Sequence, residues 1–318
     1  MAALSPLLFR PALHATGRGS LTILIYHRVN PSVDALFPGT ADAARFDSQM
    51  SWVASALNVL PLAEAVEMLR AGRIPARAAC ITFDDGYADN AEVAYPILRR
   101  HGLAATFFVA SGFLDGGRMW NDTVIEAIRR APNGALDLDF LGLGRRGLDS
   151  HQSRRETIEA IIDRVKYLPQ QARQERVDGL ARAVGDALPR DLMMRREQVR
   201  ALHAGGMEIG AHTVTHPILR ALDPAQARAE IADGKAALEA ITGAPVRLFA
   251  YPNGKPGIDY GPDHVNMARE LGFAAALCTR HGTASASSDL FELPRFTPWG
   301  ASLLRFGVGL IQNNLGHY

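Results

Sequence analysis

The chain has 318 residues, of which 47% are hydrophobic and 21% are charged. These fractions are typical of globular proteins and exclude a disordered, collagenous or coiled-coil chain. The 34 basic and 33 acidic residues leave a net charge of +1, so no global field attracts nucleic acid or an anionic membrane. We therefore expect a compact protein with no nucleic-acid partner, built as two average domains or as one large α/β domain.

We interpret residues 1–20 as an N-terminal leader, meaning a segment that precedes the domain. Pro6, Arg10, Pro11 and Arg18 interrupt its apolar stretch, whereas a secretory signal needs an unbroken apolar run. We therefore expect no signal peptide, and a location that is cytoplasmic or peripheral to the inner face of a membrane.

Short apolar runs alternate with amphipathic stretches through most of the chain, which is typical of strands and helices around a mostly parallel sheet. Glycines follow several of the helical stretches, as they do at helix ends. The expected elements are strand 21–27, helices 46–57 and 62–71, strand 78–83, helix 91–101, strand 105–111, helix 196–204, strand 207–211, helix 224–242, strand 247–251, helix 263–271 and strand 274–279.

The strand signal disappears between about residues 115 and 194. Two helices are expected there, 121–130 and 153–165, joined by a glycine-rich connection. Because the alternation of strands and helices resumes afterwards, we interpret this region as a helical insertion in one domain that spans residues 21–300.

Residues 301–318 form an amphipathic C-terminal tail. Its apolar stretch is far below the roughly 20 residues that span a bilayer, so we expect no transmembrane span. Such a stretch can still lie on a membrane surface, and peripheral membrane contact through the tail is an open alternative.

Two adjacent carboxylates, Asp84 and Asp85, follow the expected strand 78–83 in the sequence ITFDDG. Adjacent strand residues point in opposite directions, and the ends of parallel strands are where such folds place reactive groups. The two carboxylates can therefore have different roles. The alternative is a simple turn, since Asp and Gly are common turn residues.

Two imidazoles, those of His212 and His216, follow the expected strand 207–211 in the sequence HTVTHP. Residues four apart lie on one face of a helical turn, close enough to bind one divalent cation. One carboxylate of the ITFDDG motif would complete a site of two histidines and one carboxylate with open positions. Such a set suits zinc in hydrolysis, and also Co, Fe, Mn or Ni.

The order TFDDG, HTVTH and then a strand ending in FAYPNG resembles the polysaccharide deacetylase family, also called the NodB-homology family or carbohydrate esterase family 4. The opening sequence IYHRV is similar to the first strand of the branch that contains biofilm poly-N-acetylglucosamine deacetylases. The resemblance implies an α/β fold, a distorted (β/α) barrel of the NodB type that carries the helical insertion. It also implies one divalent metal ion, zinc first, and a glycan or glycolipid substrate.

By this resemblance Asp84 is the general base, while Asp85, His212 and His216 bind the metal. The cation would lower the pKa of a water molecule, and Asp84 would take the proton of that water. The hydroxide would then attack an acetamide carbonyl, which yields acetate and a free amine on the sugar.

The FAYPNG motif supplies the groups that would face the reacting carbonyl. By resemblance, the backbone N–H of Asn253 stabilises the oxyanion. Tyr251 and Pro252 of the same motif are expected at the substrate, together with Tyr87, which lies close to the aspartates. Trp120, at the start of the insertion, either stacks on a sugar ring or packs at the beginning of a helix.

The chain departs from the family pattern at the arginine that usually orients the base. That arginine stands two residues before the motif proline, and the position is Ala250 here. We predict that Arg295, on a late strand-like segment, returns to the barrel mouth and holds Asp84. The alternative is that Arg295 is a surface residue.

The chain also lacks the late apolar run that ends in a histidine acid. His27, at the end of the first expected strand, is the predicted catalytic acid. His264 and His281 are the alternatives if His27 has only a structural role.

Together these motifs predict a metal-dependent hydrolase that removes N-acetyl groups from an N-acetylhexosamine-containing polysaccharide or glycan precursor. One alternative is an amidase that acts on a small non-glycan amide or ureide, because a fold does not fix its substrate. The other is a catalytically inactive glycan-binding relative, which the missing arginine and the unassigned acid would favour.

Overall fold

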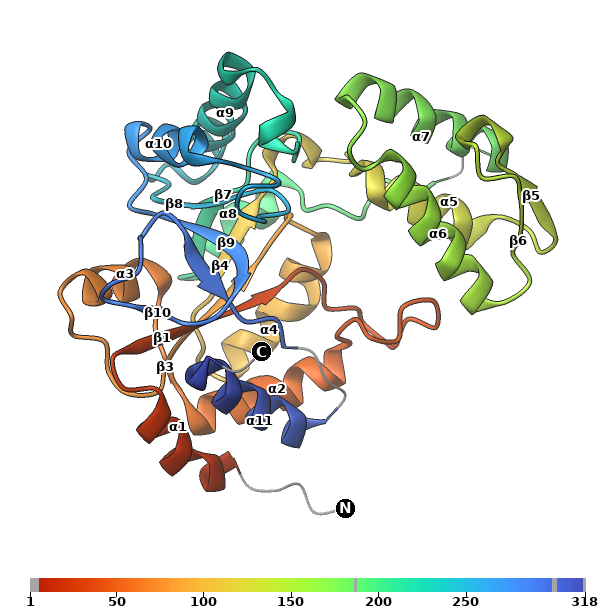
Figure 1. Ribbon diagram of the computed structural model, residues 1–318. Helices are drawn as coiled ribbons and strands as arrows, with labels where there is room; N and C mark the ends of the chain where they lie inside the picture. Colours follow the sequence, from red (N-terminus) through yellow and green to blue (C-terminus); the bar gives the residue numbers. More distant parts are fainter. Residues whose placement is uncertain (1–5, 186–187, 299–301, 317–318) are drawn as a thin grey trace.

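A sheet of parallel strands forms the centre of the computed structural model, which describes residues 6–185, 188–298 and 302–316. Phe296 closes this sheet onto its first strand, because its N–H donates to the carbonyl of Ile23 at 2.7 Å and its carbonyl accepts from the N–H of Ile25 at 3.0 Å. The expected barrel is therefore confirmed (Figure 1). In sheet order its strands are β1 (Ser20–Tyr26), β3 (Ala78–Phe83), β4 (Thr106–Val109), β7 (Glu208–Ala211), β8 (Leu248–Ala250), β9 (Ala275–His281) and β11 (Leu293–Arg295).

The six strands expected from the sequence are all present, within a few residues of the expected bounds. The strand-like segment predicted around Arg295 is β11. Two further strands of this sheet were not expected: β2 (Asn58–Val59) pairs with the start of β3, and β10 (Ala284–Ser285) pairs antiparallel with β1. Each of these strands has two residues, which is too short for a period-2 pattern to be recognised.

Helices cover the outside of the barrel (Figure 1). A different helix, α3 (Leu62–Arg70), covers the end of the barrel where the strands begin. Its residues Leu62, Val66 and Leu69 share an apolar cluster with inward-facing strand residues, and the Glu208 carboxylate accepts hydrogen bonds from its first backbone N–H groups. The helices on the outside are α2 (Ala43–Ala56), the π-helical turn Asn90–Ala94 with α4 (Tyr95–Arg100), α8 (Arg196–Ala204), α9 (Pro224–Thr242) and α10 (Pro262–Glu270).

Strand residues alternate between two apolar clusters, one inside the barrel and one between the sheet and the helices. On β3, Cys80 belongs to the inner cluster, whereas Ile81 and Phe83 belong to the outer one. On β8, Ala250 is inner and Phe249 is outer. Because the side-chain period of a strand is two residues, this alternation determines which residues at the strand ends can face the barrel mouth.

The insertion has its own apolar core, in which Ile128, Ile161 and Leu180 are buried. Two expectations for this region are wrong. A third helix is present, and the glycine-rich connection contains a two-stranded antiparallel hairpin. The sequence of the third helix is rich in arginine and glutamine with few apolar positions, and each hairpin strand has three residues. The elements are α5 (Trp120–Arg130), β5 (Ala135–Asp137), β6 (Arg145–Gly147), α6 (His151–Val165) and α7 (Gln170–Val184).

The first and last helices of the described residues lie side by side on the barrel (Figure 1). A 3-10 turn (Pro6–Phe9) and α1 (Arg10–Thr16) precede β1, and α11 (Leu303–Leu315) follows the barrel. Leu13 of α1 and Phe306 of α11 are both buried in the outer cluster. Among the described residues, no helix is both long and apolar enough to cross a membrane.

Candidate active site

The two aspartates end β3 and point in different directions. The N–H of Asp84 still donates to Tyr26 of β1 at 3.0 Å, so Asp84 continues the ladder. Asp85 then turns the chain with a φ of 76°, and Gly86 follows with a φ of 87°. A Cβ on Gly86 would lie 2.9 Å from Val109, so only glycine fits there. This turn separates the roles of two neighbouring carboxylates.

Arg295 of β11 holds Asp84 inside the barrel. Its Nη1 and Nη2 donate to the two carboxylate oxygens, each at 2.7 Å, and its Nε donates to the carbonyl of Cys278. Burial raises the pKa of Asp84, but the charges of Arg295 and His212 outweigh this effect and the net pKa is lowered. Asp84 is therefore an ionised carboxylate that can accept a proton. The structure thus places Arg295 where the sequence predicted it, and not on the surface.

Asp85, His212 and His216 form a compact group that fits one cation. The Oδ1 of Asp85 lies 3.4 Å from the Nε2 of each histidine, and the three ligand atoms lie within 4.8 Å of one another. A separation of 3.4 Å is long for a good hydrogen bond. It fits ligands that surround a zinc ion tetrahedrally at about 2.0–2.1 Å, whose mutual distance is roughly 3.4 Å.

Hydrogen bonds and burial prepare the two histidines for this role. The Nδ1 of His212 lies 2.7 Å from the carbonyl of Ala250, which fixes the tautomer and directs Nε2 towards Asp85. Burial lowers the pKa of His216 to about 4, so its imidazole is neutral, as a metal ligand must be. Burial raises the pKa of Asp85, but the neighbouring histidines lower it by a larger amount. The net pKa is therefore below its usual value, and the carboxylate is ionised.

The loop that carries both histidines is not a helical turn, so the reason given for their proximity was wrong. Thr213 and His216 have φ values of 64° and 52°, and this bent loop brings the two imidazole rings to 4.8 Å between centroids. Glu230 of α9 holds the loop from outside, since its carboxylate accepts from the N–H groups of Val214 at 2.9 Å and Thr215 at 2.8 Å. Sequence reasoning missed Glu230, because it lies on another element.

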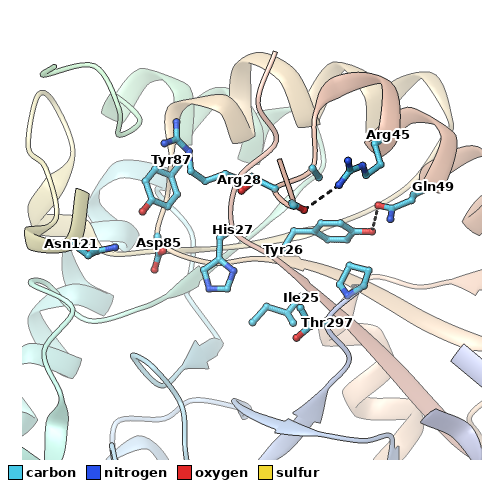
Figure 2. Close-up of a pocket in the computed structure, with 14 residues that line it drawn as sticks. Ile25, Tyr26, His27, Arg28, Arg45, Gln49, Asp85, Tyr87, Asn121 and Thr297 are labelled. Carbon is cyan, nitrogen blue, oxygen red and sulfur yellow. Dashed lines mark hydrogen bonds between the residues drawn. The ribbon is translucent and has the colours of Figure 1, made fainter. Parts of the chain in front are cut away.

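A cavity of about 290 Å³ opens beside Asp85 (Figure 2). His27 follows the end of β1 and is exposed on this cavity, and Tyr87 lines the same cavity. The guanidinium of Arg28 lies over the Tyr87 ring at 4.7 Å. The remaining lining includes Arg45, Gln49, Asn121 and Thr297, which the sequence did not single out as site residues.

The insertion reaches the cavity with the first turn of α5. Asn121 lines it, and the Tyr87 hydroxyl donates to Oδ1 of the neighbouring Asp122 at 3.0 Å. Trp120 instead packs in the core of the insertion, where the Arg173 guanidinium lies 4.9 Å from its ring centroid. Of its two expected roles, packing at the start of a helix is the one that the structure shows.

The FAYPNG motif contributes backbone and not side chains to the site. The expectation that Tyr251 contacts substrate is wrong: its ring is buried against Tyr260 at 3.8 Å, and its hydroxyl donates to the carbonyl of Phe291. Tyr251 follows Phe249 by two residues, so both point outwards. Pro252 is buried. Asn253 has a φ of 57°, and within the described residues its N–H donates no hydrogen bond.

The two alternative histidines lie elsewhere. His264 accepts a hydrogen bond from the N–H of Gly261 at the start of α10. The ring of His281, at the end of β9, lies 5.2 Å from the ring of Phe296. Neither residue lines the cavity, whereas His27 does.

A closed α/β barrel that carries an ionised carboxylate beside a two-histidine, one-carboxylate group is the architecture of a metal-assisted hydrolase. The polysaccharide deacetylase family model matches residues 71–140 and 151–276, and the chain belongs to this family. It is therefore classed as a hydrolase of non-peptide carbon–nitrogen bonds.

Individual relatives are distant in sequence but similar in fold. The Bacillus subtilis (strain 168) protein YxkH is 22% identical over 277 residues, which cover 86% of this chain and 70% of YxkH. The deacetylase PplD of Streptococcus pyogenes, solved in complex with acetate, has a TM-score of 0.61 at 20% identity, with 92% of this chain and 97% of PplD covered. IcaB from Ammonifex degensii has a TM-score of 0.60 with the same identity and coverage.

Proposed function

We propose that the chain is a metal-dependent deacetylase that removes N-acetyl groups from an N-acetylhexosamine-containing polysaccharide or glycan precursor. The observation that supports this most directly is the bidentate contact of Arg295 with Asp84, next to the group of Asp85, His212 and His216. We propose zinc as the native metal, with Co, Fe, Mn or Ni as alternatives. A bound cation of this kind polarises the acetamide carbonyl and lowers the pKa of water.

The protein's own residues supply the proton transfers. Asp84 accepts a proton from the attacking water, and Arg295 holds the carboxylate ionised and correctly oriented. The N–H of Asn253 donates to the developing oxyanion. His27 donates a proton to the leaving nitrogen as the carbon–nitrogen bond breaks, so that acetate and a free amine leave the site.

The cavity supports a sugar as the group that binds beside the reacting carbonyl. Its volume of about 290 Å³ is near the lower end of ordinary ligand pockets, which start at roughly 300 Å³. It combines apolar walls from Ile25 and Pro298 with polar groups from Gln49 and Asn121, a mixture that suits the faces and hydroxyl groups of a hexosamine. The cytoplasmic or inner-membrane location stays a prediction from the sequence.

Two variants separate the base from the metal ligands. Asp84→Asn should abolish acetate release from N-acetylglucosamine oligomers while the bound metal, measured by elemental analysis, stays. The double change of His212 and His216 to alanine should lose both the metal and the activity. If Asp84→Asn loses the metal and the double variant keeps it, the site is wrongly assigned.

A further inference from the structure

Exposed apolar side chains are concentrated at the two ends of the chain. Within the described residues nine large hydrophobic side chains are exposed, and five of them lie on the 3-10 turn and on α11. They are Leu7, Leu8, Leu304, Val308 and Leu315, with exposed fractions of 55%, 65%, 49%, 40% and 52%. We call the surface formed by the 3-10 turn, α1 and α11 the terminal face.

The helix α11 is apolar on two sides. Phe306 and Leu310 are buried against the barrel, whereas Leu304, Val308 and Leu315 follow one another at helical spacing on the outer side. The N-terminal turn lies against the same helix: a Cβ on Gly307 would lie 2.7 Å from the Phe9 ring. The N-terminal segment and α11 are therefore neighbours on the barrel (Figure 1), and we infer that their exposed apolar side chains form one surface.

The terminal face is basic, although the whole chain is nearly neutral. No Asp or Glu occurs in residues 1–33 or in residues 293–318. Arg10, Arg18 and Arg305 are exposed there, and none of them forms an ion pair with a described residue. Apolar side chains and arginines without an ion-pair partner among the described residues thus occur together on segments that contain no acidic side chain.

We propose that the terminal face binds the surface of a bilayer that contains anionic lipids. Leucine and valine side chains would enter the boundary between headgroups and acyl chains, and the arginines would pair with lipid phosphates. A second copy of this chain is a poorer partner, because a symmetric contact would bring the arginines of both copies together, and the segments that form this face have no acidic side chain to neutralise them.

This attachment would hold the cavity close to the membrane. Thr297 and Pro298 line the cavity, and α11 begins at Leu303. The stretch of chain between Pro298 and Leu303 spans at most about 18 Å. A glycan at or near the bilayer surface would therefore be within reach of the site.

Vesicle flotation tests the proposal without any measurement of catalysis. The full chain should float with vesicles of phosphatidylcholine mixed with phosphatidylglycerol, should stay behind with phosphatidylcholine alone, and should be released by salt. The double variant Leu304→Ser/Val308→Ser should lose binding, and Arg10→Glu/Arg305→Glu should weaken it by at least about fivefold for each arginine. The matched controls Val33→Ser and Arg182→Glu, which change exposed residues outside the terminal face, should bind like the unchanged protein.

Thermal unfolding of each variant shows whether it is folded. If Leu304→Ser/Val308→Ser disturbs α11, the variant Arg10→Glu/Arg305→Glu still tests membrane binding by the terminal face. Failure of the unchanged protein to float with either kind of vesicle would overturn the proposal, and so would equal loss in the controls. A dimer in size-exclusion chromatography that the same variants dissociate would show that the face binds protein instead. Acetate release from soluble oligomers should be the same in all variants, so failure here and failure of the proposed function are distinguishable.

Discussion

Asp84 and Arg295 are 211 residues apart in the chain, yet both oxygens of the carboxylate accept hydrogen bonds from the guanidinium at 2.7 Å. Both residues lie inside the barrel, where they are 2% and 1% exposed. Ala250, which stands at the position of the family arginine, instead accepts a hydrogen bond from His212 through its carbonyl. The guanidinium therefore reaches the base from β11 and not from the end of β8.

Arg295→Met should leave Asp84 as a buried carboxylate without its partner. Removing one member of a buried ion pair costs about 3–5 kcal/mol of stability. In the unchanged protein the lowered pKa of Asp84 stabilises the fold at neutral pH, and this stabilisation is lost as the pH falls through the folded-state pKa. Without Arg295, burial dominates and raises the pKa of Asp84. The acidic limb of the pH profile of kcat/KM should therefore move to higher pH.

Urea unfolding and pH-rate profiles of this variant measure both effects. Arg182→Met is the control, because Arg182 is exposed on α7, and it should change neither quantity. A variant at Arg295 with unchanged stability and an unchanged acidic limb would show that the contact does not control Asp84.

The reactive groups could be predicted because they occur as two pairs, and the members of each pair are close together in sequence. Asp84 and Asp85 follow an apolar run, and His212 and His216 follow another, so each pair marks the end of a strand. Arg295 could be proposed only because a family position was vacant at Ala250. The direction of Tyr251 could also have been predicted, since the alternation along β8 points it outwards.

Other parts of the site could not be predicted, because only the folded barrel brings them together. Glu230 lies on α9, and in sequence it is an ordinary helix glutamate. Asn121 and Asp122 begin α5 and resemble helix caps, although they reach the cavity and Tyr87 respectively. In the insertion, α7 lacked a clear apolar pattern because its buried face includes Arg173.

His27→Gln tests the assignment of the catalytic acid. Loss of a positioned acid costs about 10²–10⁴-fold in rate, so acetate release from an N-acetyl sugar should fall within this range. An aryl acetate should be affected much less, because a phenolate leaves without needing a proton. His281→Gln, at the end of β9, is the matched control. If His281→Gln shows the selective loss instead, the acid is wrongly assigned.

Glu230→Gln should weaken metal binding without unfolding the protein. Its carboxylate accepts from two backbone N–H groups of the histidine loop and from the Thr215 hydroxyl at 2.6 Å. Charge removal should loosen the loop and reduce metal affinity by about 10–100-fold, as other losses of supporting contacts do. A metal titration against a competing chelator measures this effect.

Glu239→Gln is the control for that measurement, since Glu239 is on the same helix and its carboxylate accepts from the N–H of Val246 at 3.0 Å, outside the histidine loop. It should leave the metal affinity unchanged. Equal affinities for both variants would mean that Glu230 does not position the ligands.

Asp122 should make stability depend on pH. Burial raises the pKa of this carboxyl to about 7, while an unfolded aspartate has a pKa of about 3.9. Between these values the folded state holds a proton that the unfolded state releases, so the free energy of unfolding should fall as the pH rises, by up to roughly 4 kcal/mol.

The side chain in Asp122→Asn cannot ionise and can still accept a hydrogen bond from the Tyr87 hydroxyl. The stability of this variant relative to the unchanged protein should therefore be higher at about pH 8 than at about pH 5, as urea unfolding at both values would measure. The control Asp163→Asn, at an exposed position on α6, should have the same relative stability at both pH values. If the relative stability of Asp122→Asn is also the same at both values, Asp122 is ionised in the folded protein throughout this range.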